Sequence, residues 1–270
     1  MRPSSPLVMV MKMEPSLFPT RWVYGIHTSC ATPPHLTGNY SEYLLLVREG
    51  DLFKIEADLD LQVLVPASCS GATTAHAFDL ARMESGDSVL VQGIGPLGIF
   101  SVAFARSLGA SEIIVIGGTE ERLKMCQAFG ATTALNRHRL SAGERKEAVM
   151  EVTQGRGVDV AFEMAGEPDA LKECISLVRP GGACLTAGFG EPHGKMELDC
   201  FDDIGRKNLR LQGVCVSEVR RTQVALQLIL KRPQDFKKLI THTFRLDQAN
   251  EALRAMKNKE AVKAVLRPHG

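Results

Sequence analysis

The stretch Ser88-Val-Leu-Val-Gln-Gly-Ile-Gly-Pro-Leu-Gly98 decides the fold of this chain. Val89 to Val91 form an apolar run typical of a strand buried on both faces, and the residues that follow the stretch, IFSVAFARSL, continue at helical spacing. Between them, Gly93 permits a sharp bend, Gly95 lets the backbone approach a pyrophosphate, and Gly98 brings the helix close to the sheet. Because the helix N-terminus also favours an anion, the stretch predicts a phosphate-binding turn.

The residues after this turn repeat the alternation of strand and helix. A second strand is predicted at 112–116, followed by a helix at 120–129 that Gly130 would end in a left-handed conformation. A glycine turn by itself is equally consistent with an ordinary bend. The succession of strand, glycine turn, helix and strand within about thirty residues is what the dinucleotide fingerprint requires. We therefore expect this region to bind a nucleotide.

The same alternation continues toward the C-terminus. Further strands are predicted at 133–135, 158–162, 183–187 and 209–216, with helices at 142–153 and 168–177. Six strands with helical crossovers predict an α/β fold with a doubly wound parallel sheet, and a ligand at the carboxyl ends of its strands. The other predicted elements are strands at 40–47, 52–55, 241–244 and 262–266 and helices at 72–83, 223–231 and 247–256.

The composition is that of an ordinary globular protein. Of 270 residues, 44% are apolar and 23% charged, with a formal net charge of +1. This charge supplies no basic field for nucleic acid or an anionic membrane, so we expect neither as a partner. Since no apolar run reaches the roughly 20 residues of a membrane span, and residues 7–11 are too few for a secretory signal, we expect a cytoplasmic protein.

The seven cysteines show no metal or disulfide pattern. No two of them stand in C-x-x-C spacing, which argues against a structural zinc site. Their odd number and their scatter through apolar segments argue against a disulfide framework. We expect most of them to be buried small hydrophobic residues in a reducing compartment.

Several motifs together resemble the zinc-dependent medium-chain dehydrogenase/reductase family, which includes alcohol, sorbitol and threonine dehydrogenases. The motifs are PHLTGNYSEY at 34–43, the glycine turn at 93–98, GVDVAFE at 157–163 with Gly166, RPGG at 179–182, and THTF at 241–244 with LDQA at 246–249. The resemblance implies an NAD(P)-binding Rossmann domain and a GroES-like catalytic domain, with a hydride passed between nicotinamide and a small alcohol or carbonyl substrate. It divides the chain into a loose leader at 1–20, a truncated, β-rich GroES-like part at 21–70 and 218–270, and a Rossmann domain at 71–217.

The fingerprint and the resemblance together imply a set of cofactor-binding residues. For Met164, Phe189 and Val214 the alternative is simple core packing, and for Lys263 it is a solvated lysine on an edge strand. The implied residues are Thr73, Gly93, Gly95, Pro96, Leu97, Gly98, Met164, Ala165, Ala187, Gly188, Phe189, Val214 and Lys263.

The residue at the end of the second strand determines the preference between NAD and NADP, because an acidic side chain there would hold the ribose and repel a 2′-phosphate. Gly117 occupies that position. With Gly118 beside it there is room for the phosphate, and Arg122 can supply a counter-charge. The neighbouring Glu120 and Glu121 oppose this, and an arginine on a first helical turn can be merely solvated. The sequence therefore favours NADP only slightly.

The zinc ligands are where the chain departs from the family it resembles. Cys69 stands where the resemblance places the third ligand of the catalytic zinc, but residues 1–20 do not resemble the segment that carries the other two. One thiolate cannot hold a catalytic zinc, which needs three protein ligands. His27, His35 and His76 would complete a site only in a rearranged fold. The zinc site is therefore expected to be incomplete, and no catalytic residue is assigned.

Three functions are compatible with these observations. The first is an NAD(P)-dependent oxidoreductase of the alcohol or polyol type, impaired because the Lewis acid is missing. The second is a catalytically silent nucleotide-binding or interaction protein. A methyltransferase with the same glycine turn is disfavoured, because the fifth and sixth strands and the C-terminal segments match dehydrogenases. The strands absent from the catalytic part would expose apolar surface, so a homo-oligomer is a further expectation.

Overall fold

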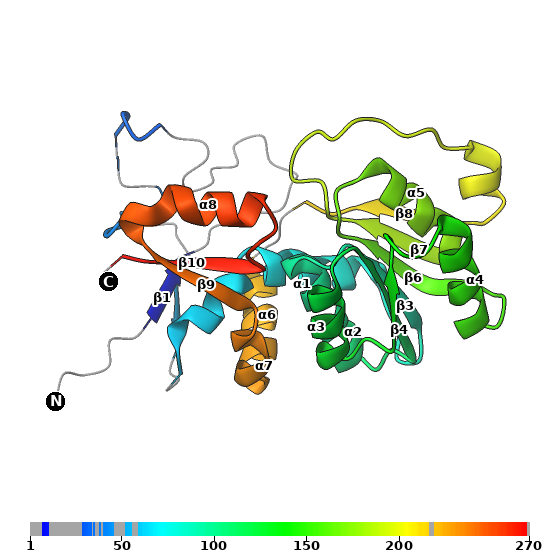
Figure 1. Cartoon of the computed structure of the whole chain (residues 1–270), viewed down its shortest axis with the longest axis horizontal. Coiled ribbons are helices and arrows are strands. Elements are labelled where there is room, and N and C mark those ends of the chain that lie inside the picture. The colour runs from blue at the N-terminus through cyan, green and yellow to red at the C-terminus, as the bar shows by residue number, and fades with distance from the viewer. Residues whose placement is uncertain are drawn as a thin grey trace. The chain divides into compact units, whose positions relative to one another are not determined.

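The computed structural model describes residues 7–10, 29–33, 35, 38, 40–45, 52–55, 59–215 and 219–268. Its internal contacts divide the chain into two compact units. Unit 1 comprises Met1–Ala72 and Val216–Gly270, and unit 2 comprises Thr73–Cys215. Figure 1 labels most of the helices and strands of the two units.

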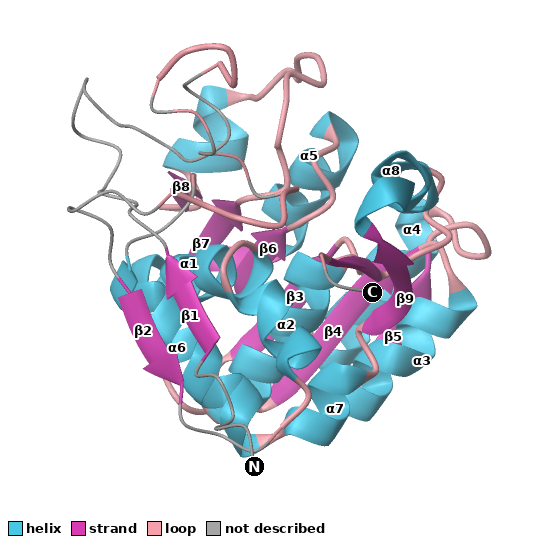
Figure 2. Ribbon diagram, turned by 90° about the vertical axis from the view of Figure 1, so that its left-hand side faces the viewer, coloured by secondary structure: helices cyan, strands magenta, loops and turns pink. Residues whose placement is uncertain are grey.

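Unit 2 is built on six parallel strands. They are β3 (Ser88–Gln92), β4 (Glu112–Gly117), β5 (Thr133–Asn136), β6 (Val158–Glu163), β7 (Val178–Thr186) and β8 (Arg210–Gly213). Their order in the sheet, β5-β4-β3-β6-β7-β8, puts the strand before the glycine turn at the centre (Figure 2). From β3 the connections run outward to β4 and β5, and then from β6 to β8 on the other side. The predicted doubly wound parallel sheet, the Rossmann arrangement, is confirmed.

Helices cover both faces of this sheet, which explains why its central strands are apolar throughout. They are α1 (Ser70–Ala81), α2 (Pro96–Ser107), α3 (Glu120–Phe129), α4 (Ala142–Val152) and α5 (Pro168–Leu177). All five residues of β3 are buried. In Figure 1, α2 and α3 lie on the opposite side of the strands from α4 and α5. On one face Phe78 stacks on Phe162 at 4.2 Å between ring centroids, and on the other Leu90 packs with Ile175 and Leu177.

Several boundaries differ from the sequence prediction: the helix predicted at 223–231 begins at Val219, and the strand predicted at 209–216 spans Arg210–Gly213. Two other differences have a reason in the backbone geometry. The helix predicted at 72–83 ends at Ala81, because Arg82 adopts a positive φ of 53°. Strand β7 begins at Val178, five residues before its predicted start at Ala183. The predicted turn at 180–182 becomes a bulge within the strand, where the pairing with β6 shifts register and Gly181 has a φ of 75°. A short π-helix, η2 (Cys200–Gly205), precedes β8.

Among its described residues, unit 1 contains two pairs of strands and several helices. Strands β1 (Leu7–Val10) and β2 (Leu52–Ile55) pair antiparallel, and β9 (Ile240–Arg245) and β10 (Lys263–Arg267) pair in parallel. The helices are the 3₁₀ segments η1 (Leu61–Ala67) and η3 (Leu246–Gln248) with α6 (Val219–Lys231), α7 (Pro233–Lys237) and α8 (Ala249–Lys257). Segment η1 contacts α6, α7 and β10, so the core of this unit lies around it.

The N-terminal part of unit 1 corrects two expectations. Residues 40–45 form bends and irregular backbone where a strand at 40–47 is predicted, and the last two residues of that prediction lie outside the described ranges. Tyr40 is 63% and Tyr43 72% exposed, so the aromatic side chains that suggested a strand face solvent. The strand at 52–55 is confirmed. Its partner β1 lies in the methionine-rich segment 1–20, where the sequence predicts no element and most residues are outside the description.

All seven cysteines are free thiols, but fewer are buried than predicted. Cys126, Cys174 and Cys184 are buried, and burial raises the pKa of the Cys126 thiol to about 12. The other four, Cys30, Cys69, Cys200 and Cys215, are exposed. Among the described helices, none has the length and apolar character needed to cross a bilayer.

A partly buried polar cluster joins β3 to β6 at the amino end of the sheet. Asp159 accepts hydrogen bonds from the backbone N–H and hydroxyl of Ser88, at 2.8 and 2.6 Å, and from Arg179 Nε at 2.5 Å. Burial alone would raise the pKa of Asp159, but the hydrogen bonds from Ser88 and the nearby Arg179 guanidinium lower it to about 2. The ionised carboxylate therefore stabilises the folded chain.

Asp159→Asn is expected to flatten the acid dependence of stability. Because the folded-state pKa lies below the ordinary value of 3.8, the carboxylate contributes fully above about pH 4 and loses its contribution as the pH falls toward 2. The variant should lose about 1–2 kcal/mol in the free energy of unfolding at pH 7, and less at pH 3. Urea unfolding at both pH values measures the difference. An equal loss at the two values would contradict the role of the charge.

Candidate functional site

The glycine turn lies at the carboxyl end of the central strand, and two of its glycines are required by close contacts. A Cβ on Gly93 would lie 2.5 Å from the backbone nitrogen of Ala165, and Gly93 has a φ of 99°. A Cβ on Gly98 would overlap the carbonyl oxygen of Gly93. These two glycines therefore let the turn, the loop after β6 and helix α2 meet without side chains between them.

Gly95 differs from its two neighbours, because its position faces open space. Outside its own chain neighbours, no described atom lies within 4 Å of a Cβ built there. Gly95 is the N-cap of α2 and Pro96 is its first residue, so the helix supplies the N–H groups of Leu97 and Gly98 without intrahelical partners. The turn thus presents backbone donors and a positive helix end beside an open, side-chain-free surface. This is the geometry that receives a phosphate.

The loops after β6 and β7 are held together by a buried carboxylate. Glu163 is fully buried and accepts hydrogen bonds from the backbone of Ala165 at 2.7 Å, the backbone of Gly166 at 2.6 Å and the hydroxyl of Thr186 at 2.8 Å. A Cβ on Gly188 would overlap the nitrogen of Gly166. The two loops therefore run in direct contact at the switch point of the sheet, where doubly wound folds bind their ligands.

The ends of β4 and β5 are shaped by other contacts. A Cβ on Gly117 would overlap the side chain of Ile94, which is buried in the glycine turn. A Cβ on Gly118 would lie 2.6 Å from Nε2 of His138 and 3.3 Å from Nε of Arg137. The space beside Gly117, expected to leave room for a phosphate, is thus filled by Ile94, while Gly118 lies under two basic side chains.

Backbone hydrogen bonds beyond the strand ends join these loops along the side of the sheet where the strands have their carboxyl ends, which is called the edge below. Met164 donates to the carbonyl of Gln92 at 2.7 Å and Val214 to that of Thr186 at 2.8 Å. Most of the predicted cofactor residues are brought together at this edge. They are Gly93, Gly95, Pro96, Leu97, Gly98, Gly117, Gly118, Met164, Ala165, Ala187, Gly188, Phe189 and Val214.

The remaining predicted residues belong to other elements of the chain. Thr73 is buried on α1, whose Thr74 hydroxyl donates to the carbonyl of Leu97 at 3.3 Å. Phe189, which is one of the residues at the edge, is 38% exposed, so core packing does not explain it. Cys69 and Lys263 belong to unit 1. The sequence patterns predict no role for Glu163, although a charged residue that ends an apolar strand is a recognisable signal.

The residues described here do not fit a catalytic zinc. Within the described ranges, no three His, Cys, Asp or Glu side chains are grouped so that they could ligate one ion. Cys69 is exposed, and His35 directs Nδ1 to the carbonyl of Cys30 at 2.9 Å. His27 lies outside the described residues. A catalytic zinc needs three protein ligands, so no chemical step is derived through one.

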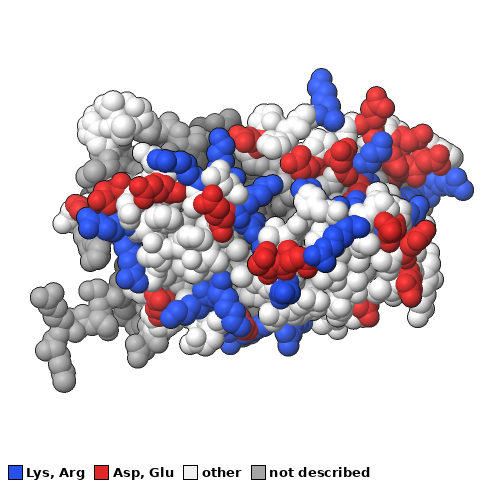
Figure 3. Space-filling model, in the orientation of Figure 1, with Lys and Arg blue, Asp and Glu red and all other residues white. Residues whose placement is uncertain are grey.

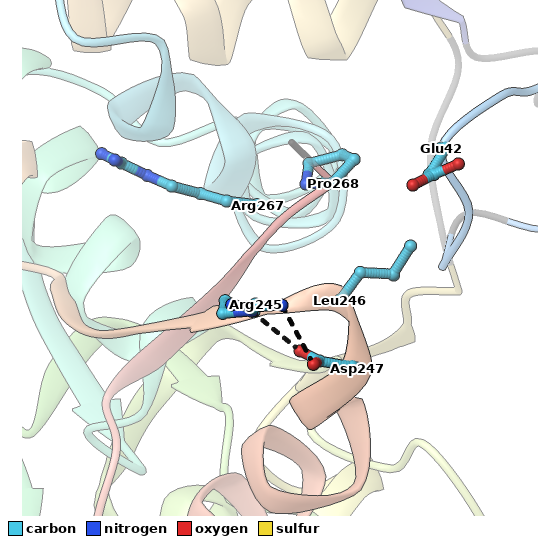
Figure 4. Close-up of a pocket in the computed structure, with 6 residues that line it drawn as sticks. All are labelled: Glu42, Arg245, Leu246, Asp247, Arg267 and Pro268. Atoms are coloured by element: carbon cyan, nitrogen blue, oxygen red, sulfur yellow. Dashed lines mark hydrogen bonds and ion pairs between the residues drawn. The ribbon is translucent and has the colours of Figure 1, made fainter. Parts of the chain in front are cut away.

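Unit 1 carries a separate pocket of about 320 Å³. Figure 4 shows Arg245 and Asp247 facing one another, with Leu246 directed toward Glu42. The Arg245 guanidinium donates to both carboxylate oxygens of Asp247 at 3.2 Å. The charges of Arg245 and Asp247 are thus paired with each other. Over the face in Figure 3, acidic and basic side chains are interspersed among the described residues.

A glycine turn of this geometry on a doubly wound sheet defines a class of proteins, the Rossmann-type dinucleotide-binding domains. Residues 96–231 match the family model described as zinc-binding dehydrogenase. The chain belongs to this family.

Similar proteins agree with this membership. The chain is 30% identical over 231 residues to an L-threonine 3-dehydrogenase of Shewanella baltica and 32% identical over 232 residues to that of Shewanella halifaxensis. Each alignment covers 85% of this chain and 64% of the relative, so the chain spans less than two thirds of their length. The crystal structure of an alcohol dehydrogenase from Thermotoga maritima superposes with a TM-score of 0.90 at 41% identity, covering 94% of this chain and 70% of that one.

Proposed function

We propose that the chain binds a nicotinamide dinucleotide and belongs functionally to the NAD(P)-dependent oxidoreductases of the alcohol or polyol type. The observation that carries the proposal is the contrast within the glycine turn: Gly93 and Gly98 are closely packed, whereas Gly95 faces open space beside the start of α2. The likeness to threonine and alcohol dehydrogenases supports a small alcohol or carbonyl as substrate. When bound, the nicotinamide would supply hydride chemistry.

In this proposal the residues of the chain have distinct tasks. The N–H groups of Leu97 and Gly98 hold the pyrophosphate. The loops that Glu163 fixes, at 164–166 and 187–189, form the wall along which the nicotinamide half lies. Thr73 and Lys263 remain predicted contacts. A preference for NADP over NAD is part of the proposal, since no acidic side chain occupies position 117 or 118.

Direct titration tests the proposal. NADH and NADPH fluorescence is followed as the full chain is added, and isothermal calorimetry gives the affinities for the oxidised forms. Saturable binding at one site per chain is the expected result. A folded chain that binds neither cofactor would refute the proposal.

A catalytically silent dinucleotide-binding protein is the second candidate, and it is favoured by the lack of a grouped ligand set among the described residues. We expect the purified chain of 270 residues to contain well under one zinc per molecule, because Cys69 is the only ligand that the family resemblance assigns. Metal analysis by mass spectrometry after gel filtration measures this. One tightly held zinc per chain would contradict it and would favour the active oxidoreductase.

We also propose a cytoplasmic location and keep a homo-oligomer as a prediction. The location is supported by the seven free thiols, which suit a reducing compartment. Gel filtration with light scattering measures the oligomeric state.

A further inference from the structure

We infer that Arg137 and His138, in the loop after β5, form a subsite for the phosphate on the 2′-position of a ribose. The inference rests on the proposed dinucleotide binding and names the group that this end of the site recognises. It shifts the recognition of that phosphate from Arg122, on the first turn of α3, to a loop that follows the neighbouring strand.

The position of the two basic side chains carries the inference. Both are exposed, and both lie directly over Gly118, at 3.3 Å for Arg137 Nε and 2.6 Å for His138 Nε2 from a Cβ built on that glycine. The loop is fixed in place, because the backbone N–H of Arg137 donates to the carbonyl of Gly117 at 2.8 Å. The amide N–H of His138 likewise donates to Oδ1 of Asn136 at 2.9 Å.

The end of β4 is where the adenosine ribose lies when the pyrophosphate occupies the adjacent glycine turn. A doubly charged phosphate there needs cationic donors and cannot tolerate an unpaired carboxylate. Gly118 contributes no side chain, so nothing separates the ribose from the guanidinium and imidazole above it. The site therefore offers the cationic donors that a 2′-phosphate requires.

The acidic neighbour that would oppose a phosphate is already engaged. Glu120 accepts a hydrogen bond from Nδ2 of Asn136 at 2.5 Å and lies 3.2 Å from Nε of Arg139. The charge of Glu120 is thus compensated by Arg139, and its carboxylate is held by the Asn136 side chain at the end of β5. Glu121 is exposed on the helix. Arg122 is half-buried, and this burial lowers the pKa of its guanidinium.

The test compares ligands that differ only in the 2′-phosphate. The affinities of 2′,5′-ADP and 5′-AMP, and of NADP and NAD, are measured by calorimetry for the full chain and for Arg137→Ala, His138→Ala and Arg122→Ala. Arg156→Ala is the charge-matched control, since Arg156 is exposed just before β6, at the amino ends of the strands and away from the glycine turn. We expect Arg137→Ala to weaken 2′,5′-ADP and NADP about 10- to 100-fold, with 5′-AMP and NAD changed less than about twofold.

A second variant tests the same subsite by gain of function. Gly118→Asp places a carboxylate under Arg137 and His138, and only side-chain atoms stand in its way: the His138 imidazole must move, and the Arg137 side chain must shift by a few tenths of an ångström. The variant should prefer NAD over NADP, because the carboxylate holds the ribose hydroxyls and repels the phosphate.

The outcomes separate the inference from the function on which it rests. Loss of binding confined to the 2′-phosphate ligands in Arg137→Ala supports the inference. Equal affinities of the unmodified chain for both ligands of each pair would overturn it and leave dinucleotide binding intact. A phosphate-specific loss in Arg122→Ala but not in Arg137→Ala would also overturn it. If none of the four ligands binds the folded chain, the proposed function itself fails.

Discussion

Gly95→Val is expected to abolish dinucleotide binding while leaving the fold intact. The backbone at Gly95 has a φ of −77°, which any residue adopts, and the Cβ of valine would enter open space. That space is where the pyrophosphate must approach the N–H groups of Leu97 and Gly98. We expect the dissociation constants of NAD and NADP to rise more than about 100-fold, since several charge-assisted hydrogen bonds are lost together.

Two measurements are needed on the same variant. Calorimetry gives the affinity, and thermal unfolding in the absence of ligand should place the Tm of Gly95→Val within about 2 °C of the unmodified chain. Gly98→Ala is the control: it is a substitution of another glycine of the same turn, and it is expected to change stability, whereas Gly95→Val is not. A Cβ on Gly98 would overlap the carbonyl oxygen of Gly93, so Gly98→Ala should lower the Tm strongly. Unchanged affinity in a folded Gly95→Val protein would remove the pyrophosphate from this turn.

The sequence predicts most of unit 2 because its local signals agree with the fold. The run at Val89 to Val91 is apolar at every position, and the structure buries it from both sides. Helix α4 begins with a capping box between Ser141 and Glu144, and Gly130 ends α3 with a φ of 129°. Such signals lie within a few residues of each element, so they can be read without knowing what packs against it.

The failures occur where the outcome depends on a distant partner. Tyr40 and Tyr43 have the residue types of a strand, but a strand also needs a neighbouring strand that completes its ladder of hydrogen bonds, and residues 40–45 are not in a strand. Strand β1 gains its partner from residues 52–55, more than forty positions away. The turn-like sequence at 180–182 becomes a bulge because β6 continues the pairing on both sides of it.

The site shows the same division between local and distant information. The glycine turn is readable because every residue with a role is adjacent in sequence. At Gly117 the sequence predicts room for a phosphate. In the structure a side chain is excluded there because Ile94 fills the space beside it. Arg137 and His138 follow a different strand from Gly118, so only the parallel pairing of β4 and β5 brings them over it. No local pattern marks such residues.

Glu163→Ala is expected to destabilise unit 2 and to loosen the dinucleotide site at the same time. The carboxylate accepts two backbone N–H groups, from Ala165 and Gly166, and the hydroxyl of Thr186, while it is fully buried. Alanine would remove the acceptor of the buried Gly166 N–H and of the part-buried Ala165 N–H. Each unsatisfied donor costs about 1–3 kcal/mol, so the free energy of unfolding should fall by about 3 kcal/mol or more.

The Glu163→Gln variant separates hydrogen bonding from charge and volume. The glutamine side-chain oxygen can accept from both N–H groups and its amide can donate to Thr186, so a loss of only about 1 kcal/mol is expected. Urea unfolding gives these energies, and NAD titration should show about tenfold weaker binding in the alanine variant, because the loops at 164–166 and 187–189 lose their common anchor. If alanine and glutamine cost the same, the carboxylate does not act by holding the two loops. If alanine costs less than about 0.5 kcal/mol, the three hydrogen bonds do not hold the edge together.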